Sequence, residues 1–101
     1  MKSEIFDRYT DLVCKRFDIS REMLFSKTKK REIVDARQLL FFLCYNRPMS
    51  MAYIQKFMLK GGLNIAHTSI IKGIRNIEDK LKYDEDYISV VTNLVKSVTI
   101  Q

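Results

Sequence analysis

The sequence predicts an all-α domain: a compact bundle of five to six helices that contains a helix-turn-helix. Apolar residues recur at helical spacing in several separate segments, and Gly, Pro, Ser and Asp fall between those segments. The hydrophobic fraction of 47% in 101 residues is large enough for a core and too large for a disordered chain. Because no repeat or linker interrupts the pattern, we expect residues 1–101 to form one domain.

The first half of the chain predicts two helical segments, a basic loop and a long helix. Ser3 is expected to cap the first helix, and Ser20 is expected to cap a short helical turn. The loop spans Ser26 to Lys30, and the long helix runs from about Arg31 to Tyr45, where Asn46-Arg47-Pro48 ends it. The inward residues are expected to be Ile5, Tyr9, Leu12, Val13 and Phe17, then Met23, Leu24 and Phe25, then Ile33, Ala36, Leu39, Leu40, Phe41, Phe42, Leu43 and Cys44.

The second half predicts three helices. Ser50 can cap a helix from Met51 to about Leu59, and Gly61-Gly62 can end it in the left-handed conformation. The next helix runs from about Ala66 to Lys82, and Asp84 can cap a last helix. The apolar faces comprise Ile54, Phe57 and Met58, then Ile70, Ile74, Ile77 and Leu81, then Tyr87, Ile88, Val91, Leu94, Val95 and Val98.

Charge is segregated along the chain, whose net charge is +6. No Asp or Glu occurs between Ala36 and Ile77, where the basic residues are Arg37, Arg47, Lys56, Lys60, Lys72 and Arg75. The segment Lys27-Thr28-Lys29-Lys30-Arg31 adds four more positive charges. This distribution predicts one basic surface of the kind that binds a polyanion. A solvated lysine-rich face is the alternative interpretation of the charge pattern alone.

The segments 51–59 and 66–82 form the predicted helix-turn-helix, whose second helix would enter a major groove by its N-terminus. That helix begins with His67, Thr68 and Ser69, all of which can form hydrogen bonds to base edges or phosphates. Lys72, about one turn later, would reach the flanking backbone. In the alternative interpretation, Thr68 or Ser69 is only a helix N-cap and His67 is a surface residue.

The segment Gly61 to Glu78, GGLNIAHTSIIKGIRNIE, resembles the C-terminal DNA-binding domain (domain IV) of the bacterial replication initiator DnaA. That family has a glycine pair, a His-Thr/Ser-Thr/Ser triplet and a hydrophobic helix ending in Arg-x-Ile-Glu, in the same order. Leu24-Phe25-Ser26-Lys27, Lys29, Arg31 and Ala36-Arg37-Gln38 also match at the family's spacing. The resemblance extends from about Asp11 to Val98, and it implies a Trp-repressor-like helical fold that binds double-stranded DNA.

Three departures from the family pattern affect the expected reading of bases. The family inserts an arginine of the basic loop into the minor groove, where this chain has Lys29, which lacks the planar guanidinium. The family has an acidic residue before the histidine, where this chain has Ala66. The turn is also longer, and its Asn64 could contact adenine in place of the lost polar contact. We therefore expect a retained scaffold with an altered target sequence.

Several classes of activity find no support in the sequence. Lys60-Gly61-Gly62 lacks the spacing of a phosphate-binding loop, so we expect no nucleotide and a free-standing domain without an ATPase module. We propose no catalytic residue, metal or cofactor, since His67 has no second ligand nearby. Cys14 and Cys44 are expected to be reduced, buried thiols, and a disulfide is the alternative. We expect no membrane segment and a cytoplasmic, nucleoid-associated location.

The sequence thus predicts a double-stranded-DNA-binding protein of replication initiation or transcription, in a host or a phage or mobile element, with replication or transcription proteins as further partners. The expected DNA contacts are Lys27, Lys29, Lys30, Arg31, Lys56, Lys60, Asn64, His67, Thr68, Ser69 and Lys72. A protein-interaction adaptor that keeps the fold is the alternative. Single-stranded or RNA binding would need exposed aromatics such as Tyr45 and Tyr53. The DNA hypothesis requires the His67 end of its helix and the lysine-rich loop to face the same side.

Overall fold

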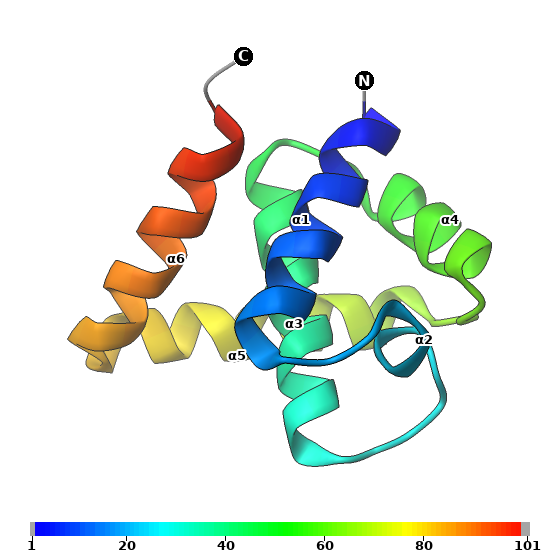
Figure 1. Cartoon of the computed structure of the whole chain (residues 1–101), viewed down its shortest axis with the longest axis horizontal. Coiled ribbons are helices and arrows are strands. Elements are labelled where there is room, and N and C mark those ends of the chain that lie inside the picture. The colour runs from blue at the N-terminus through cyan, green and yellow to red at the C-terminus, as the bar shows by residue number, and fades with distance from the viewer. Residues whose placement is uncertain (1, 100–101) are drawn as a thin grey trace.

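The computed structural model describes residues 2–99, and the side chains of residues 2–96. This part of the chain contains six α-helices and no strand (Figure 1). The helices are α1 (Lys2–Phe17), α2 (Arg21–Leu24), α3 (Arg31–Asn46), α4 (Met51–Gly61), α5 (His67–Tyr83) and α6 (Glu85–Thr99). The predicted all-α class is confirmed, and the predicted helix bounds differ from these by one or two residues.

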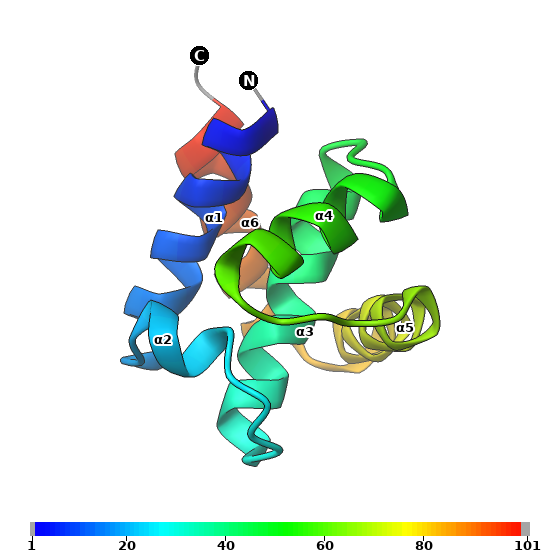
Figure 2. The same cartoon turned by 90° about the vertical axis from the view of Figure 1, so that its right-hand side faces the viewer.

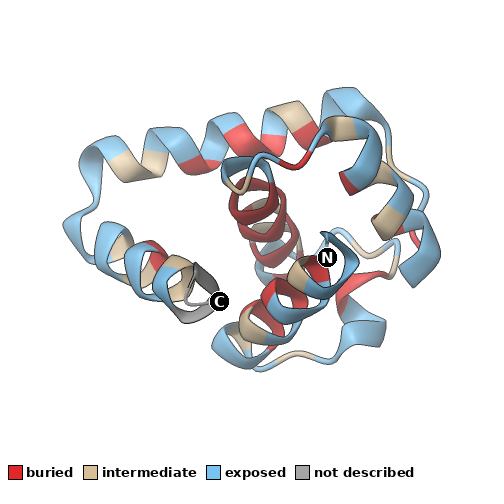
Figure 3. Ribbon diagram, turned by 90° about the horizontal axis from the view of Figure 1, so that it is seen from above, coloured by how far each residue is buried: buried red, intermediate tan, exposed pale blue. Residues whose placement is uncertain are grey.

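Helix α3 runs through the middle of the molecule, and α1, α2, α4 and α5 all pack against it. It appears nearly end-on and mostly buried at the centre of Figure 3. Its buried positions include the pairs Leu39-Leu40 and Phe41-Phe42, so apolar side chains surround the helix instead of lining one stripe. A helix that is apolar on most sides is expected in the core of a bundle. The sequence-based prediction that this helix crosses the core is confirmed.

Three of the predicted helix caps are present. The Ser20 hydroxyl accepts from Met23 N at 3.1 Å, and the Ser50 hydroxyl accepts from Tyr53 N at 3.2 Å. The Asp84 carboxylate accepts from Tyr87 N at 3.1 Å and so caps α6. The prediction for Ser3 is wrong, because α1 already begins at Lys2 and Ser3 lies inside its first turn.

Some residues assigned to the core lie at its edge. Met23 is 38% exposed and Ile88 is 42% exposed, so neither points fully inward as predicted. Helix α2 is a single turn, and only its last residue, Leu24, is buried. In α1 the buried stripe is centred on Phe6, Tyr9 and Val13 and includes Thr10, whose hydroxyl donates to Phe6 O at 2.8 Å. The Val98 side chain lies outside the described side chains.

The two adjacent glycines that end α4 have different functions. Gly62 has a φ of 115°, a left-handed conformation that favours glycine. Its N–H donates to Leu59 O and the N–H of Leu63 donates to Met58 O, both at 3.0 Å, which is the Schellman ending of a helix. Gly61 lies under the ring of Phe25, where an added Cβ would be 2.8 Å from the nearest ring carbon. The sequence predicted the conformational requirement but not the packing requirement.

Both cysteines are free and buried, as predicted. Burial raises the pKa of the Cys14 thiol, and burial also raises the pKa of the Cys44 thiol. Both thiols therefore stay protonated and pack as small apolar groups.

Candidate nucleic-acid interface

A hollow of about 470 Å³ separates the basic loop before α3 from the first turns of α5. Lys27 and Lys29 line it from the loop, and Ser69 and Lys72 line it from α5. Its floor comes from α3 and from the turn before α5, through Val34, Arg37, Gln38, Phe41, Leu63 and Ile65. Segments some 40 residues apart in the sequence thus place their cations around one depression. His67 and Thr68 do not line this hollow. That the His67 end of α5 faces the same side as the loop therefore stays a prediction.

Arg37 of α3 holds the basic loop in place through hydrogen bonds to the carbonyls of the loop and of α2. Its guanidinium donates through Nε to Leu24 O at 2.7 Å and through Nη2 to Thr28 O at 3.0 Å and to Ser26 O. The residue is only 8% exposed, and burial lowers the pKa of its guanidinium because the charge loses water. Since these three acceptors are neutral carbonyls, the positive charge remains uncompensated beside the hollow.

The sequence predicted one basic surface that includes Arg37 and Arg47, but the structure buries much of both side chains. Arg37 contributes charge to the hollow, but its Nε and Nη2 donors are occupied by carbonyls of Leu24, Ser26 and Thr28. Arg47 is partly buried, and it forms a side-chain hydrogen bond with Tyr9. The surface around the hollow therefore depends on lysines of the loop and of α5.

Helix α5 begins at His67, so Thr68 and Ser69 are its second and third residues and neither is its N-cap. The N-cap is Ala66, which has no side chain to accept a hydrogen bond. Figure 2 shows the turn that leads from α4 into this end of α5, which is viewed end-on. All three residues of the His67-Thr68-Ser69 triplet are exposed. The alternative in which Thr68 or Ser69 only caps the helix is therefore wrong.

His67 is held by α4. Its Nε2 lies 3.0 Å from Oε1 of Gln55, and Nε2 of the same Gln55 donates to Ile65 O at 2.8 Å. One amide side chain therefore contacts both the turn between the two helices and the first residue of α5.

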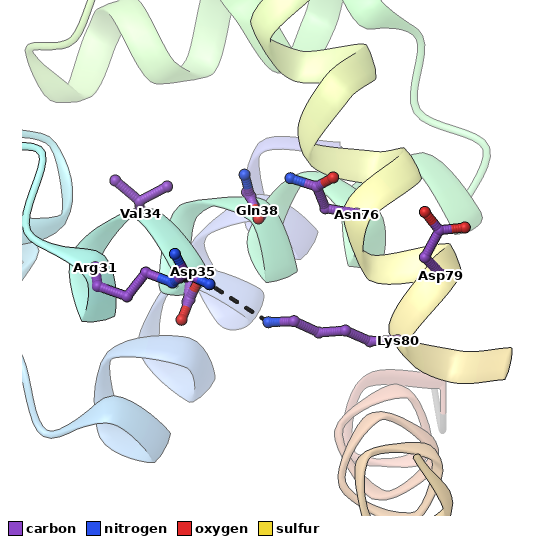
Figure 4. Close-up of a pocket in the computed structure, with 7 residues that line it drawn as sticks. All are labelled: Arg31, Val34, Asp35, Gln38, Asn76, Asp79 and Lys80. Carbon is purple, nitrogen blue, oxygen red and sulfur yellow. Dashed lines mark ion pairs between the residues drawn. The ribbon is translucent and has the colours of Figure 1, made fainter. Parts of the chain in front are cut away.

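The other predicted DNA contacts lie outside the hollow between the basic loop and α5. Lys30 is the N-cap of α3, and Arg31 pairs with Asp35 at 3.7 Å. Lys80 of α5 also reaches Asp35, at 3.9 Å, beside a second hollow lined by Arg31 (Figure 4).

Lys60 lines a separate hollow with Asp7 and Arg21 on the side of α1 and α2. Lys56 and Asn64 are exposed on α4 and in the turn, and neither lines the main hollow.

Comparison with known proteins identifies the architecture. The family described as "Bacterial dnaA protein helix-turn-helix" matches residues 7–77, which contain the basic loop, α4 and most of α5. This chain belongs to that family. It is 37% identical over 87 residues to the chromosomal replication initiator protein DnaA of Oleidesulfovibrio alaskensis, covering 85% of this chain and 18% of that protein. It is 28% identical over 94 residues to the DnaA of Bacteroides thetaiotaomicron, covering 92% of this chain and 19% of that protein.

A third relative is chromosomal replication initiator protein DnaA 2 of Chlamydia caviae, 31% identical over 88 residues, covering 86% of this chain and 18% of that protein. The chain thus spans about a fifth of the length of the curated relatives that it matches. The resemblance stated from the sequence is confirmed. The matched residues of the DnaA helix-turn-helix family end within α5, so α6 lies beyond them.

Two residues that shape the site, Arg37 and Gln55, are not among the DNA contacts expected from the sequence. Arg37 lies four residues after Ile33 and three residues before Leu40, so helical spacing places it on the apolar face of this helix. An arginine on such a face signals a buried guanidinium with local acceptors. Gln55 carried no signal of its own, because its partner His67 is twelve residues away on another helix.

The exposed aromatics of the domain do not line the hollow. Tyr53 is 41% exposed, but its ring stacks with Phe57 and lies under the Lys2 ammonium at 4.2 Å. Tyr45 lies near the end of α3, away from the basic loop. In the described part of the chain, no group of three or more His, Cys, Asp or Glu side chains could hold a metal, and no helix is long and apolar enough to cross a membrane.

Proposed function

We propose that this DnaA-family domain binds double-stranded DNA with a sequence preference, and acts in replication initiation or its regulation. The observation that supports the proposal is the convergence of the basic loop and the start of α5 on one hollow. The DnaA relatives are named as chromosomal replication initiators, which favours an origin as the place of action. Occupying a promoter would make the same domain a transcription regulator.

In the proposed complex, His67, Thr68 and Ser69 enter the major groove while the loop lies on the adjacent backbone or minor groove. The start of α5 carries a partial positive charge and N–H groups that no side chain caps, so it attracts a phosphate. Lys27, Lys29 and Lys72 line the hollow, and in the complex they contact the phosphates of the DNA backbone that crosses it. Weaker contacts come from residues outside the hollow, namely Lys30, Arg31, Lys56 and Asn64. Lys60 reaches DNA only if the duplex curves towards α1 and α2.

Affinity for random-sequence duplex DNA is expected to fall steeply with salt. If four to six cations meet phosphates, log affinity against log salt has a slope of roughly −4 to −5. A fourfold rise in salt then weakens binding roughly 250- to 1,000-fold. Fluorescence polarisation at several salt concentrations measures the slope.

Two double variants test whether the lysines that line the hollow cause the salt dependence of DNA binding. Lys27→Gln with Lys29→Gln should make the slope less negative by about two, while Lys15→Gln with Lys82→Gln should leave it nearly unchanged. No binding at low salt would favour the protein-interaction adaptor instead. Selection of bound duplexes from a random pool then tests the sequence preference.

A side-chain cap on α5 should stabilise the fold, and an acidic cap should in addition weaken binding to random duplex DNA. Ala66 has φ −79° and ψ 153°, close to the φ −84° and ψ 160° of Ser20, whose hydroxyl does cap α2. Ala66→Ser should therefore accept a hydrogen bond from the first turn and add about 1 kcal/mol to the free energy of unfolding. Ala66→Asp restores the acidic residue that the family has before the histidine, and it should stabilise similarly. Its carboxylate repels phosphate, so non-specific affinity for random duplex should be several-fold lower than that of Ala66→Ser.

Thermal unfolding and polarisation measure the two effects separately. About 1 kcal/mol corresponds to a rise in Tm of roughly 4–8 °C for a domain of this size. Equal affinity for the Ala66→Asp and Ala66→Ser variants would show that no phosphate approaches this end of α5.

A further inference from the structure

The contact between Gln55 and His67 has a defined polarity. The amide of Gln55 has one donor end and one acceptor end, and the donor end, Nε2, is used by Ile65 O at 2.8 Å. The acceptor end, Oε1, therefore faces Nε2 of His67 at 3.0 Å. Because a carbonyl oxygen can only accept, the histidine nitrogen opposite it must carry the hydrogen. In the neutral ring this leaves Nδ1 without a proton.

We infer that Gln55 is a positioning residue that orients the His67 ring and fixes its tautomer, so that Nδ1 faces the DNA as a hydrogen-bond acceptor. The inference rests on the proposed function, and it specifies what His67 reads. In the major groove, the groups that donate to an acceptor are the exocyclic amino groups, N6 of adenine and N4 of cytosine. Guanine offers only acceptors there, N7 and O6, and would face the lone pair of Nδ1.

The position of Gln55 explains how one residue achieves this. It is part-buried on α4, and both of its partners belong to the segment that places the start of α5. A histidine at an exposed helix start would otherwise sample several ring orientations. Two hydrogen bonds from one amide limit that freedom before DNA arrives, which favours binding through a single ring orientation.

Nuclear magnetic resonance of the free protein tests the tautomer, because His67 is the single histidine of the chain. Under mildly alkaline conditions, the ¹⁵N shifts should identify Nε2 as the protonated nitrogen, with an N–H proton protected from exchange with water. Gln55→Leu should abolish that protection. Gln55→Glu should keep it, because the carboxylate still accepts from Nε2 although it cannot donate to Ile65 O. A hydrogen on Nδ1, or unchanged protection in Gln55→Leu, would overturn the inference.

A double-mutant cycle tests the consequence for reading bases. Duplexes from the selected site, changed at one base pair at a time, should include one position where adenine or cytosine is preferred about tenfold over guanine. Gln55→Leu should reduce this preference to about twofold or less, and His67→Ala should remove it. In the His67→Ala background, Gln55→Leu should change it no further. Equal losses from Gln55→Leu in both backgrounds would mean that Gln55 acts through the fold and not through His67.

The two experiments separate this inference from the proposed function. If the domain binds no DNA, the resonance of the free protein still reports whether Gln55 fixes the ring. If DNA binding follows the expected salt dependence but the preferred base opposite His67 is guanine, the function stands and the inferred acceptor role fails.

Discussion

Replacing Arg37 with methionine is expected to lower the free energy of unfolding by about 3 kcal/mol and to weaken duplex binding about tenfold. The substitution keeps the apolar stem but removes the donors that hold Leu24 O, Ser26 O and Thr28 O. The Leu24 contact is buried, so its carbonyl is left without a partner. The loop that carries Lys27 and Lys29 then loses its fixed shape.

Thermal unfolding should show a fall in Tm of roughly 10–20 °C. Duplex binding should be measured well below the variant's own Tm, so that the loss reports loop order and not unfolding. Arg8→Met is the matched control, because Arg8 is exposed on α1 and does not line the hollow. It removes the same charge and should change stability by about 0.5 kcal/mol or less.

Arg37→Lys distinguishes charge from hydrogen-bond geometry. Lysine keeps the charge but lacks the planar fork that reaches several carbonyls at once. We expect an intermediate loss of stability and of duplex binding. Wild-type binding by Arg37→Lys would show that only the charge matters, and would contradict the positioning role.

Replacing Gly73 with valine is expected to destabilise the domain by about 3 kcal/mol and to move α5 away from α3. Gly73 is buried where α5 crosses α3, and an added Cβ would lie 3.0 Å from Cγ of Gln38 and 3.0 Å from Cδ2 of Phe41. Phe41 is fully surrounded in the core and has little room to move. The two further methyl groups of valine therefore find no space.

The control is Asn76→Val, because Asn76 is exposed on the same helix and the two variants introduce the same side chain. It should change the free energy of unfolding by about 0.5 kcal/mol or less. Gly73→Val should also lower duplex affinity at temperatures where it is folded, since the spacing between Lys72 and the loop lysines changes. Equal stabilities of the two variants would contradict the close approach of α5 and α3.

Much of this fold follows from local patterns. The serines at 20 and 50 and the aspartate at 84 cap helices as predicted, because a cap depends only on residues within one turn. Gly62 ends α4 because its own backbone conformation is unusual. Ser3 failed as a cap because another residue that can begin a helix precedes it.

Predictions that depended on neighbours distant in sequence were less successful. Helical periodicity identified the apolar face of each helix, but it could not show how much of that face a neighbouring helix covers. Met23 and Ile88 lie on such faces and are nevertheless 38% and 42% exposed. Periodicity places Arg37 on the apolar face of its helix but could not identify its acceptors, which lie 9 to 13 residues earlier in the chain.

The sequence by itself determined the helices, the segregation of charge and the family motif, because each is encoded in residues close together along the chain. Only the tertiary structure decided which cations share a surface. Lys27 and Lys29 join Lys72 around one hollow, whereas Lys60 faces α1 and α2. It also decided that Gln55 holds His67. The physical reason is that hydrogen bonds and fields depend on distances in space, and helix packing alone sets those distances between segments remote in sequence.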